Sequence, residues 1–103
     1  MEPTETQRLP TQRLDVWLHR ARLFKTRSLA GAQITKGRVR VTRAGQTTRV
    51  TKPHYKLSPG DELSLTRAGE LLLLRVESLP TRRGPYAEAK DCYTSLQGDI
   101  SAD

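Results

Sequence analysis

The sequence predicts an α+β domain in which two basic helices pack on a small, mostly antiparallel sheet. Apolar residues recur with the 3.6-residue period of a helix between Leu14 and Ala21. From Arg38 the period changes to two, as in a half-buried strand, and glycine-containing turn signals follow at short intervals. A chain of 103 residues is long enough for one modest core, so a single domain is expected.

The first predicted helix follows a polar segment. Residues 1–12 contain two prolines and no periodic apolar pattern, so a disordered lead is expected there. The next apolar residues recur at i, i+3, i+4 and i+7, which predicts an amphipathic helix with a core stripe of Leu14, Trp17, Leu18 and Ala21. Residues off this stripe are mainly basic, so the helix has a buried side and a basic side.

The second predicted helix lies between Thr26 and Gly37. The Thr26 hydroxyl is placed to cap its first turn, and Gly37 supplies the left-handed residue that ends it. Lys36 in the last turn suits the helix dipole. The residues expected to face the first helix are apolar or small: Leu29, Ala30, Gly31, Ala32 and Ile34.

Period-two alternation predicts strands in the middle of the chain. Val39 and Val41 alternate with polar residues, and a hairpin turn at 43–46 leads to a return strand. Because proline cannot donate a backbone hydrogen bond, the proline-containing segment 52–56 is expected to be a loop or a sheet edge.

Two more strands complete the predicted sheet. A strong turn signal at 58–61 precedes a strand in which Leu63 and Leu65 alternate with polar residues. The last strand is expected at 71–78, where four consecutive leucines suggest burial on both faces.

The C-terminal part is expected to contain a linker and a short helix. Residues 79–84 are interpreted as a hinge-like linker, and Pro85 suits a first helical position. The helix is predicted from a stripe of Tyr86, Ala89, Tyr93 and Leu96. The predicted organisation is therefore a lead at 1–12, a folded domain at 13–78, a linker and helix at 79–98, and a frayed tail at 99–103.

The charge distribution points to a polyanionic partner. The net charge is +7, yet segment 13–56 carries twelve basic residues and one acid, Asp15, whereas 57–103 carries five bases and eight acids. Such a lopsided charge is typical of a nucleic-acid-binding face. Phosphates are typically bound by long cationic side chains, hydroxyl groups and helix N-termini, all of which are expected near the two helices. The candidate contacts are Arg13, Arg20, Arg22, Lys25, Thr26, Arg27, Ser28, Lys36, Arg38 and Arg40.

Other classes of protein fit less well. The single cysteine excludes an internal disulfide, no Cys/His cluster suggests a metal, and no cofactor-binding loop is present. No apolar run is long enough to span a bilayer and the N-terminus is not a secretory signal, so a cytoplasmic location is expected. No enzyme is expected either. A ribonuclease using His19 and His54 is conceivable, but both are interpreted as surface residues, and Cys92 as a semi-buried packing thiol.

Two interpretations of the helix pair stay open. It resembles a helix-turn-helix, so duplex DNA is an alternative partner, although Gly31, Ala32 and Gln33 stand where base-reading side chains would be wanted. Phe24 between the helices is interpreted as an apolar plug, with a stacking platform for an unpaired base as the alternative. Trp17 is expected in the core.

The order of these motifs resembles the RNA-binding domain named after small-subunit ribosomal protein S4. The matching pieces are RLDVWLHRARLFKTRSLA, KGRVRV and KLSPGDELSL, and the ending RRGPYAEAKDCY is similar to the stand-alone heat-shock-protein-15 family. The resemblance implies a two-helix αL motif on a small antiparallel sheet with a short C-terminal helix. It also implies that the ten candidate residues contact structured RNA.

For the heat-shock branch, the resemblance implies a stress-response protein that binds the free large ribosomal subunit still holding a nascent chain on tRNA. Ribosomal RNA is thus the expected partner, with tRNA or DNA as further candidates and a monomer as the expected state. The chain departs from the family pattern in the turn Thr42-Arg43-Ala44-Gly45-Gln46, which is longer than usual, and in its acidic ending.

Overall fold

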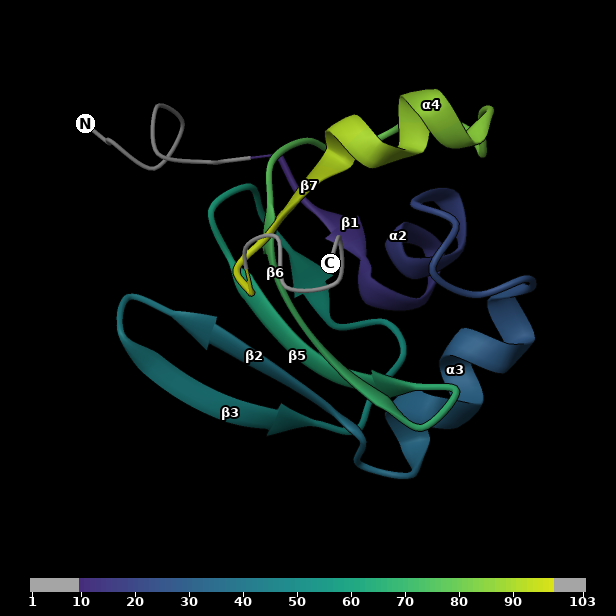
Figure 1. Ribbon diagram of the computed structural model, residues 1–103. Coiled ribbons are helices and arrows are strands. Elements are labelled where there is room, and N and C mark those ends of the chain that lie inside the picture. The colour runs from purple at the N-terminus through teal and green to yellow at the C-terminus, as the bar shows by residue number, and fades with distance from the viewer. Residues whose placement is uncertain (1–9, 98–103) are drawn as a thin grey trace.

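The computed structural model describes residues 10–97, so the predictions for residues 1–9 and 98–103 lie outside the described part of the chain. Two helices lie against one side of a curved antiparallel sheet, and the last described element adds a strand to that sheet (Figure 1). This is the predicted α+β fold. No helix among residues 10–97 is both long and apolar enough to cross a membrane.

The elements follow one another in the predicted order, with four short additions, namely β1, β4, β7 and a 3₁₀ turn, whose bounds are given below. The helices are α2 (Leu14–Arg20), α3 (Arg27–Thr35), α4 (Tyr86–Ala89) and the 3₁₀ turn η1 (Lys90–Cys92). The main sheet has the order β3-β2-β5-β6-β7, formed by β2 (Val39–Arg43), β3 (Gln46–Val50), β5 (Glu62–Arg67), β6 (Glu70–Val76) and β7 (Tyr93–Ser95). A second, two-stranded sheet pairs β1 (Gln12–Arg13) with β4 (Lys56–Leu57).

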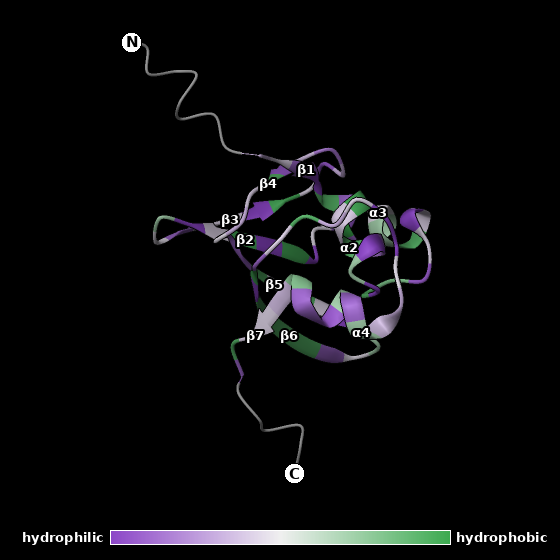
Figure 2. Cartoon of the chain, turned by 90° about the horizontal axis from the view of Figure 1, so that it is seen from above, coloured by the Kyte–Doolittle hydropathy of each residue, from purple (hydrophilic) through white to green (hydrophobic). Residues whose placement is uncertain are grey.

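The helix α2 buries its predicted stripe completely. Leu14, Trp17 and Leu18 have no exposed surface, and Ala21 is 1% exposed. Hydrophobic segments gather where α2 and the strands meet (Figure 2). Burying a large apolar side chain contributes about 1.5–3 kcal/mol, so this stripe anchors the helix layer on the sheet.

The helix α3 begins and ends as its sequence predicts. The amide of Leu29 donates to Thr26 Oγ1 at 3.0 Å, and Gly37 adopts the left-handed φ of 78° just after the helix. Its inner face differs from the prediction at two residues, because Leu29 is 50% exposed and Ala32 is exposed as well, while Ala30 and Ile34 are buried. The α3 stripe is therefore narrower than expected.

Gly31 does allow a close approach, but its neighbour is a loop. A side chain at Gly31 would meet the ring of Pro53 at 3.7 Å. The carbonyl of Pro53 also accepts a hydrogen bond from the amide of Asp15 at 3.1 Å. The loop between β3 and β4 is therefore held between the start of α2 and the middle of α3.

The strands alternate as predicted around the core. Val41 lies opposite Leu63 in the pairing of β2 with β5, and both side chains are buried. The β2–β3 hairpin turns at Ala44 and Gly45, whose φ angles of 53° and 80° match the twist of the flanking strands.

The prediction that the leucine-rich strand is buried on both faces is wrong. In β6, Leu74 and Val76 point into the core, whereas Leu71 is 53% exposed. The reason is the layering, because the helices cover one face of the sheet and no second layer covers the other within residues 10–97.

The predicted C-terminal helix is shorter than its stripe suggested. After α4 and η1 the chain extends, and Tyr93 pairs with Val76 as β7 joins the edge of β6. Tyr93 does pack on the core, edge-to-face with Trp17 at a ring distance of 6.3 Å. Pairing satisfies the backbone groups that an open β6 edge would expose, which a helix at this place could not do.

The segments next to the folded domain are tied to α2. Gln12 lies in the segment predicted to be a disordered lead, yet it pairs with Leu57, and its side chain donates to the carbonyl of Pro80 at 2.8 Å. Trp17 Nε1 donates to the carbonyl of Ser78 at 2.9 Å. The chain between β6 and α4 thus lies along α2, while the division at residue 78 stays a prediction.

Candidate nucleic-acid interface

Asp15 organises the start of both helices. The residue is 4% exposed, and its carboxylate accepts hydrogen bonds from Arg13 Nε at 3.1 Å, Arg13 Nη2 at 3.0 Å and Arg27 Nε at 3.1 Å. Burial opposes ionisation of Asp15, but the hydrogen bonds and charges of Arg13 and Arg27 outweigh it and lower the pKa of the carboxyl group. One acid therefore joins β1, α2 and α3 while leaving both arginines about half exposed.

This arrangement predicts an acid-sensitive contribution to stability. Since the folded-state pKa of Asp15 is lowered, its contribution is complete above the unfolded-state pKa of about 3.9 and is lost as pH falls through the folded-state value. We expect Asp15→Asn to lower the free energy of unfolding at neutral pH by about 1–3 kcal/mol. Urea unfolding should show this difference shrinking near pH 3.

The exposed acid Asp91 offers a matched control for that measurement. Asp91→Asn changes the same chemical group at a surface site and should leave the free energy of unfolding nearly unchanged. An equal loss of stability for Asp15→Asn at neutral pH and at pH 3 would contradict the role given to the ion pairs.

Arg20 and Arg22 have structural contacts in addition to their charge. Arg20 donates to the carbonyl of Pro80 at 2.9 Å, and Arg22 donates to that of Gly84 at 2.5 Å. In return, Arg83 Nε donates to the carbonyl of His19 at 3.0 Å. Through these hydrogen bonds, the three arginines hold the segment before α4 against the end of α2. The charge pattern of the sequence does not indicate this structural role.

The other candidate cations face solvent around α3 and on β2. Lys25, Lys36 and Arg40 are exposed and form no ion pair with a carboxylate of residues 10–97. Arg38 makes only a long, exposed contact of 3.4 Å with Gln33 Oε1. Ser28 is exposed beside the Thr26 cap.

The structure does not gather all ten candidates at one point. The nine residues of α3 span about 13 Å, which separates Lys25 at its start from Lys36 at its end. Arg40 lies farther along, on the exposed face of β2. The candidates therefore form a strip over the helix pair and the adjoining strand, and which of them contact RNA stays a prediction.

Segment 13–56 exposes cations without exposing an acid. Its single acid, Asp15, is buried, so the segment has twelve basic residues and contributes no carboxylate to the surface. Such an arrangement lowers the stability of the free protein slightly and favours binding of an anion.

One cation of the segment, Arg43, has a structural role that the sequence did not indicate. Arg43 binds Asp61 through two hydrogen bonds of 2.9 and 2.7 Å, and Asp61 also accepts from the amide of Ser58 at 2.8 Å. The hydrogen bonds with Asp61 raise the pKa of Arg43. The SPGD turn is the sequence signal that could have indicated this role, because it places the Asp61 carboxylate within reach of both the Ser58 amide and the strand residue Arg43.

The two histidines lie near opposite ends of α2. His19 lies in the last turn of α2, whereas His54 is exposed in the loop bonded to the first turn of that helix. Burial raises the pKa of the Cys92 thiol, as expected for a packing cysteine. Phe24 is partly buried against the core, which agrees with its interpretation as an apolar plug.

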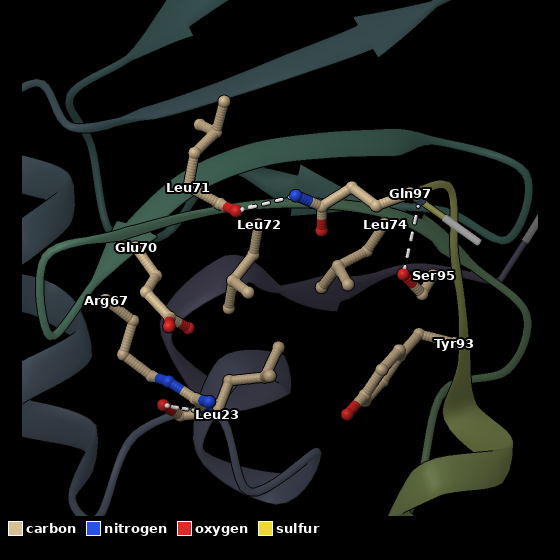
Figure 3. Close-up of a pocket in the computed structure, with 9 residues that line it drawn as sticks. All are labelled: Leu23, Arg67, Glu70, Leu71, Leu72, Leu74, Tyr93, Ser95 and Gln97. Carbon is tan, nitrogen blue, oxygen red and sulfur yellow. Dashed lines mark hydrogen bonds between the residues drawn. The ribbon is translucent and has the colours of Figure 1, made fainter. Parts of the chain in front are cut away.

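A hollow of about 450 Å³ lies away from this strip, between the α2–α3 link and β6–β7 (Figure 3). Its walls are mainly apolar, including Leu72, Leu74 and Tyr93. The guanidinium of Arg67 at one end is bonded to the carbonyl of Leu23 at 3.3 Å and lies beside Glu70. Because Glu70 is negatively charged and Arg67 is already hydrogen-bonded to Leu23, this hollow is poorly suited to a phosphate.

The fold and its cationic strip define an RNA-binding domain of the S4 type. The S4 domain family matches residues 12–63. Among solved structures, the chain is similar to the trimeric structure of Vibrio cholerae Heat Shock Protein 15, with a TM-score of 0.77 and 30% identity over 90% of this chain and 89% of that chain. No curated protein sequence matches it.

The chain therefore belongs to the S4 domain family, in the branch that resembles heat shock protein 15. The predicted α+β fold and the predicted family are both confirmed. RNA is accordingly the class of partner.

Proposed function

We propose that this protein binds ribosomal RNA of the free large subunit and helps to rescue subunits that retain a nascent chain on tRNA. It acts in the cytoplasm and without catalysis. The observation that carries the proposal is the exposed cationic strip of segment 13–56, whose single acid is buried beneath Arg13 and Arg27. The similarity to heat shock protein 15 over most of both chains supports the choice of this branch.

The binding mechanism is electrostatic and depends on RNA shape. Exposed cations at both ends of α3 lie against phosphates of a folded RNA and release its counterions. The exposed face of α3 includes Leu29 and Ala32, whose side chains cannot hydrogen-bond to base edges, so few groups of this helix can read bases in a major groove. This geometry favours structured RNA over duplex DNA.

Sedimentation of tagged protein through sucrose gradients of cell lysate tests the proposal. We expect the protein to migrate with free large subunits at low salt and to dissociate at moderate salt, because six to ten phosphate contacts lose about 10³–10⁵ in affinity between roughly 50 and 200 mM salt. Protein that stays at the top of the gradient at low salt would refute the ribosomal role. Light scattering of the free protein determines its oligomeric state in parallel, since the similar Vibrio cholerae structure is trimeric.

A further inference from the structure

A second hollow, of about 390 Å³, lies over β3 and the loop to β4, outside the ten candidate residues. Its lining includes three cations, Arg49, Lys52 and Lys56, together with His54 and Tyr55, and no acid. None of the three cations forms an ion pair with a carboxylate in the described range 10–97. The hollow therefore combines an aromatic wall with unpaired positive charge.

The ring of Tyr55 is held in a fixed position at this hollow. Arg43 lies over the ring at 5.5 Å from its centre and is itself bonded to Asp61 and, at 3.0 Å, to the carbonyl of Lys56. The Tyr55 backbone is bonded on both sides, to the carbonyl of Lys52 at 3.0 Å and to the amide of Leu14 at 2.8 Å. A ring that is already ordered loses little entropy when a ligand stacks on it.

The hollow is continuous with the cationic strip. Arg40 lies directly opposite Arg49 in the pairing of β2 with β3, so two like charges share one exposed face of the sheet. Directly opposed like charges destabilise a sheet unless an anion lies between them. The Arg49 side chain also runs past Gly37, where a Cβ would come within 3.2 Å of it, and so reaches the end of α3 beside Lys36 and Arg38.

We propose that this hollow is a second part of the RNA interface, which takes one unpaired base against Tyr55 while Arg49, Lys52 and Lys56 bind the flanking phosphates. The inference rests on the proposed RNA-binding function and extends it to a preference for RNA with an unpaired nucleotide. Unpaired bases stack on aromatic side chains in RNA recognition, and cations beside them bind the backbone.

The test compares two fluorescein-labelled RNA hairpins that differ by one bulged uridine. By fluorescence anisotropy, the wild-type protein should bind the bulged hairpin more tightly than the fully paired one. Tyr55→Leu keeps the apolar volume but removes the ring, so it should lose at least about fivefold in affinity for the bulged hairpin alone. Tyr55→Phe should bind both hairpins as the wild type does, since stacking needs the ring and not the hydroxyl group.

Removing the cations of the hollow is expected to affect the two hairpins equally, unlike removing the Tyr55 ring. Lys52→Gln with Lys56→Gln should weaken binding of both hairpins and reduce the slope of log affinity against log salt by about 1–2. Tyr86→Leu and Lys90→Gln are matched controls, because both residues are exposed on α4 and η1, outside the strip and the hollow, and should change neither quantity.

A crosslink provides a readout that needs no variant. With 4-thiouridine at the bulge, irradiation of the wild-type complex should attach the RNA within residues 48–56, as mapped by mass spectrometry. Crosslinks elsewhere only, or equal effects of Tyr55→Leu on the two hairpins, would overturn this inference and leave the proposed function standing. Failure of the wild-type protein to bind either hairpin would overturn both.

Discussion

Replacing Lys25, Arg38 and Arg40 together by glutamine is expected to lower affinity for ribosomal RNA by about 10²-fold near 0.1 M salt. These three side chains are exposed at the two ends of α3 and on β2, and none is paired with a carboxylate of residues 10–97. Their removal should therefore cost phosphate contacts and not folding. The slope of log affinity against log salt should fall by about 2–3 in filter-binding titrations.

The chain offers a control with the same change of charge. Arg75, Arg82 and Lys90 are also exposed, but they lie on β6, before α4 and in η1, outside the cationic strip. Replacing these three by glutamine removes the same three positive charges and should leave the salt slope unchanged. If both triple variants lost affinity equally, binding would depend on net charge and the assigned surface would be wrong.

The largest loss of stability is expected from Trp17→Ala. Trp17 has no exposed surface, packs on Tyr93 and donates to the carbonyl of Ser78 at 2.9 Å. Truncating a buried tryptophan costs about 3–5 kcal/mol, a large part of the roughly 5–15 kcal/mol available to a domain. Thermal unfolding followed by circular dichroism should show the midpoint falling by more than about 10 °C.

Two further variants separate packing from hydrogen bonding at this site. Trp17→Phe keeps a ring in the core but removes the donor to Ser78, so it should cost about 1–3 kcal/mol. Tyr86→Ala removes a ring that is 62% exposed and should change the midpoint little. Similar midpoints for Trp17→Ala and the wild type would show that the link between α2 and the Ser78 region is not part of the stable core.

Much of the cationic strip could be predicted because it depends on local sequence. The Thr26 cap, the Gly37 stop and the alternation of Val39 with Arg40 each follow from residues within a few positions of one another. The excess of cations in 13–56 is a count along the chain. The uses of Arg20, Arg22 and Arg43 could not be predicted in this way, since their partners are Pro80, Gly84 and Asp61.

The sequence by itself determined the α+β class, the order of the main elements, the core stripe of α2 and the segment that carries the positive charge, because each depends on short-range period and composition. Tertiary structure alone decided that Tyr93 enters a strand, that Gln12 pairs with Leu57, and that Arg43 lies over the ring of Tyr55. The physical reason is that backbone pairing and side-chain partners across tens of residues depend on which edges and faces the folded core leaves open, and no local pattern encodes that choice.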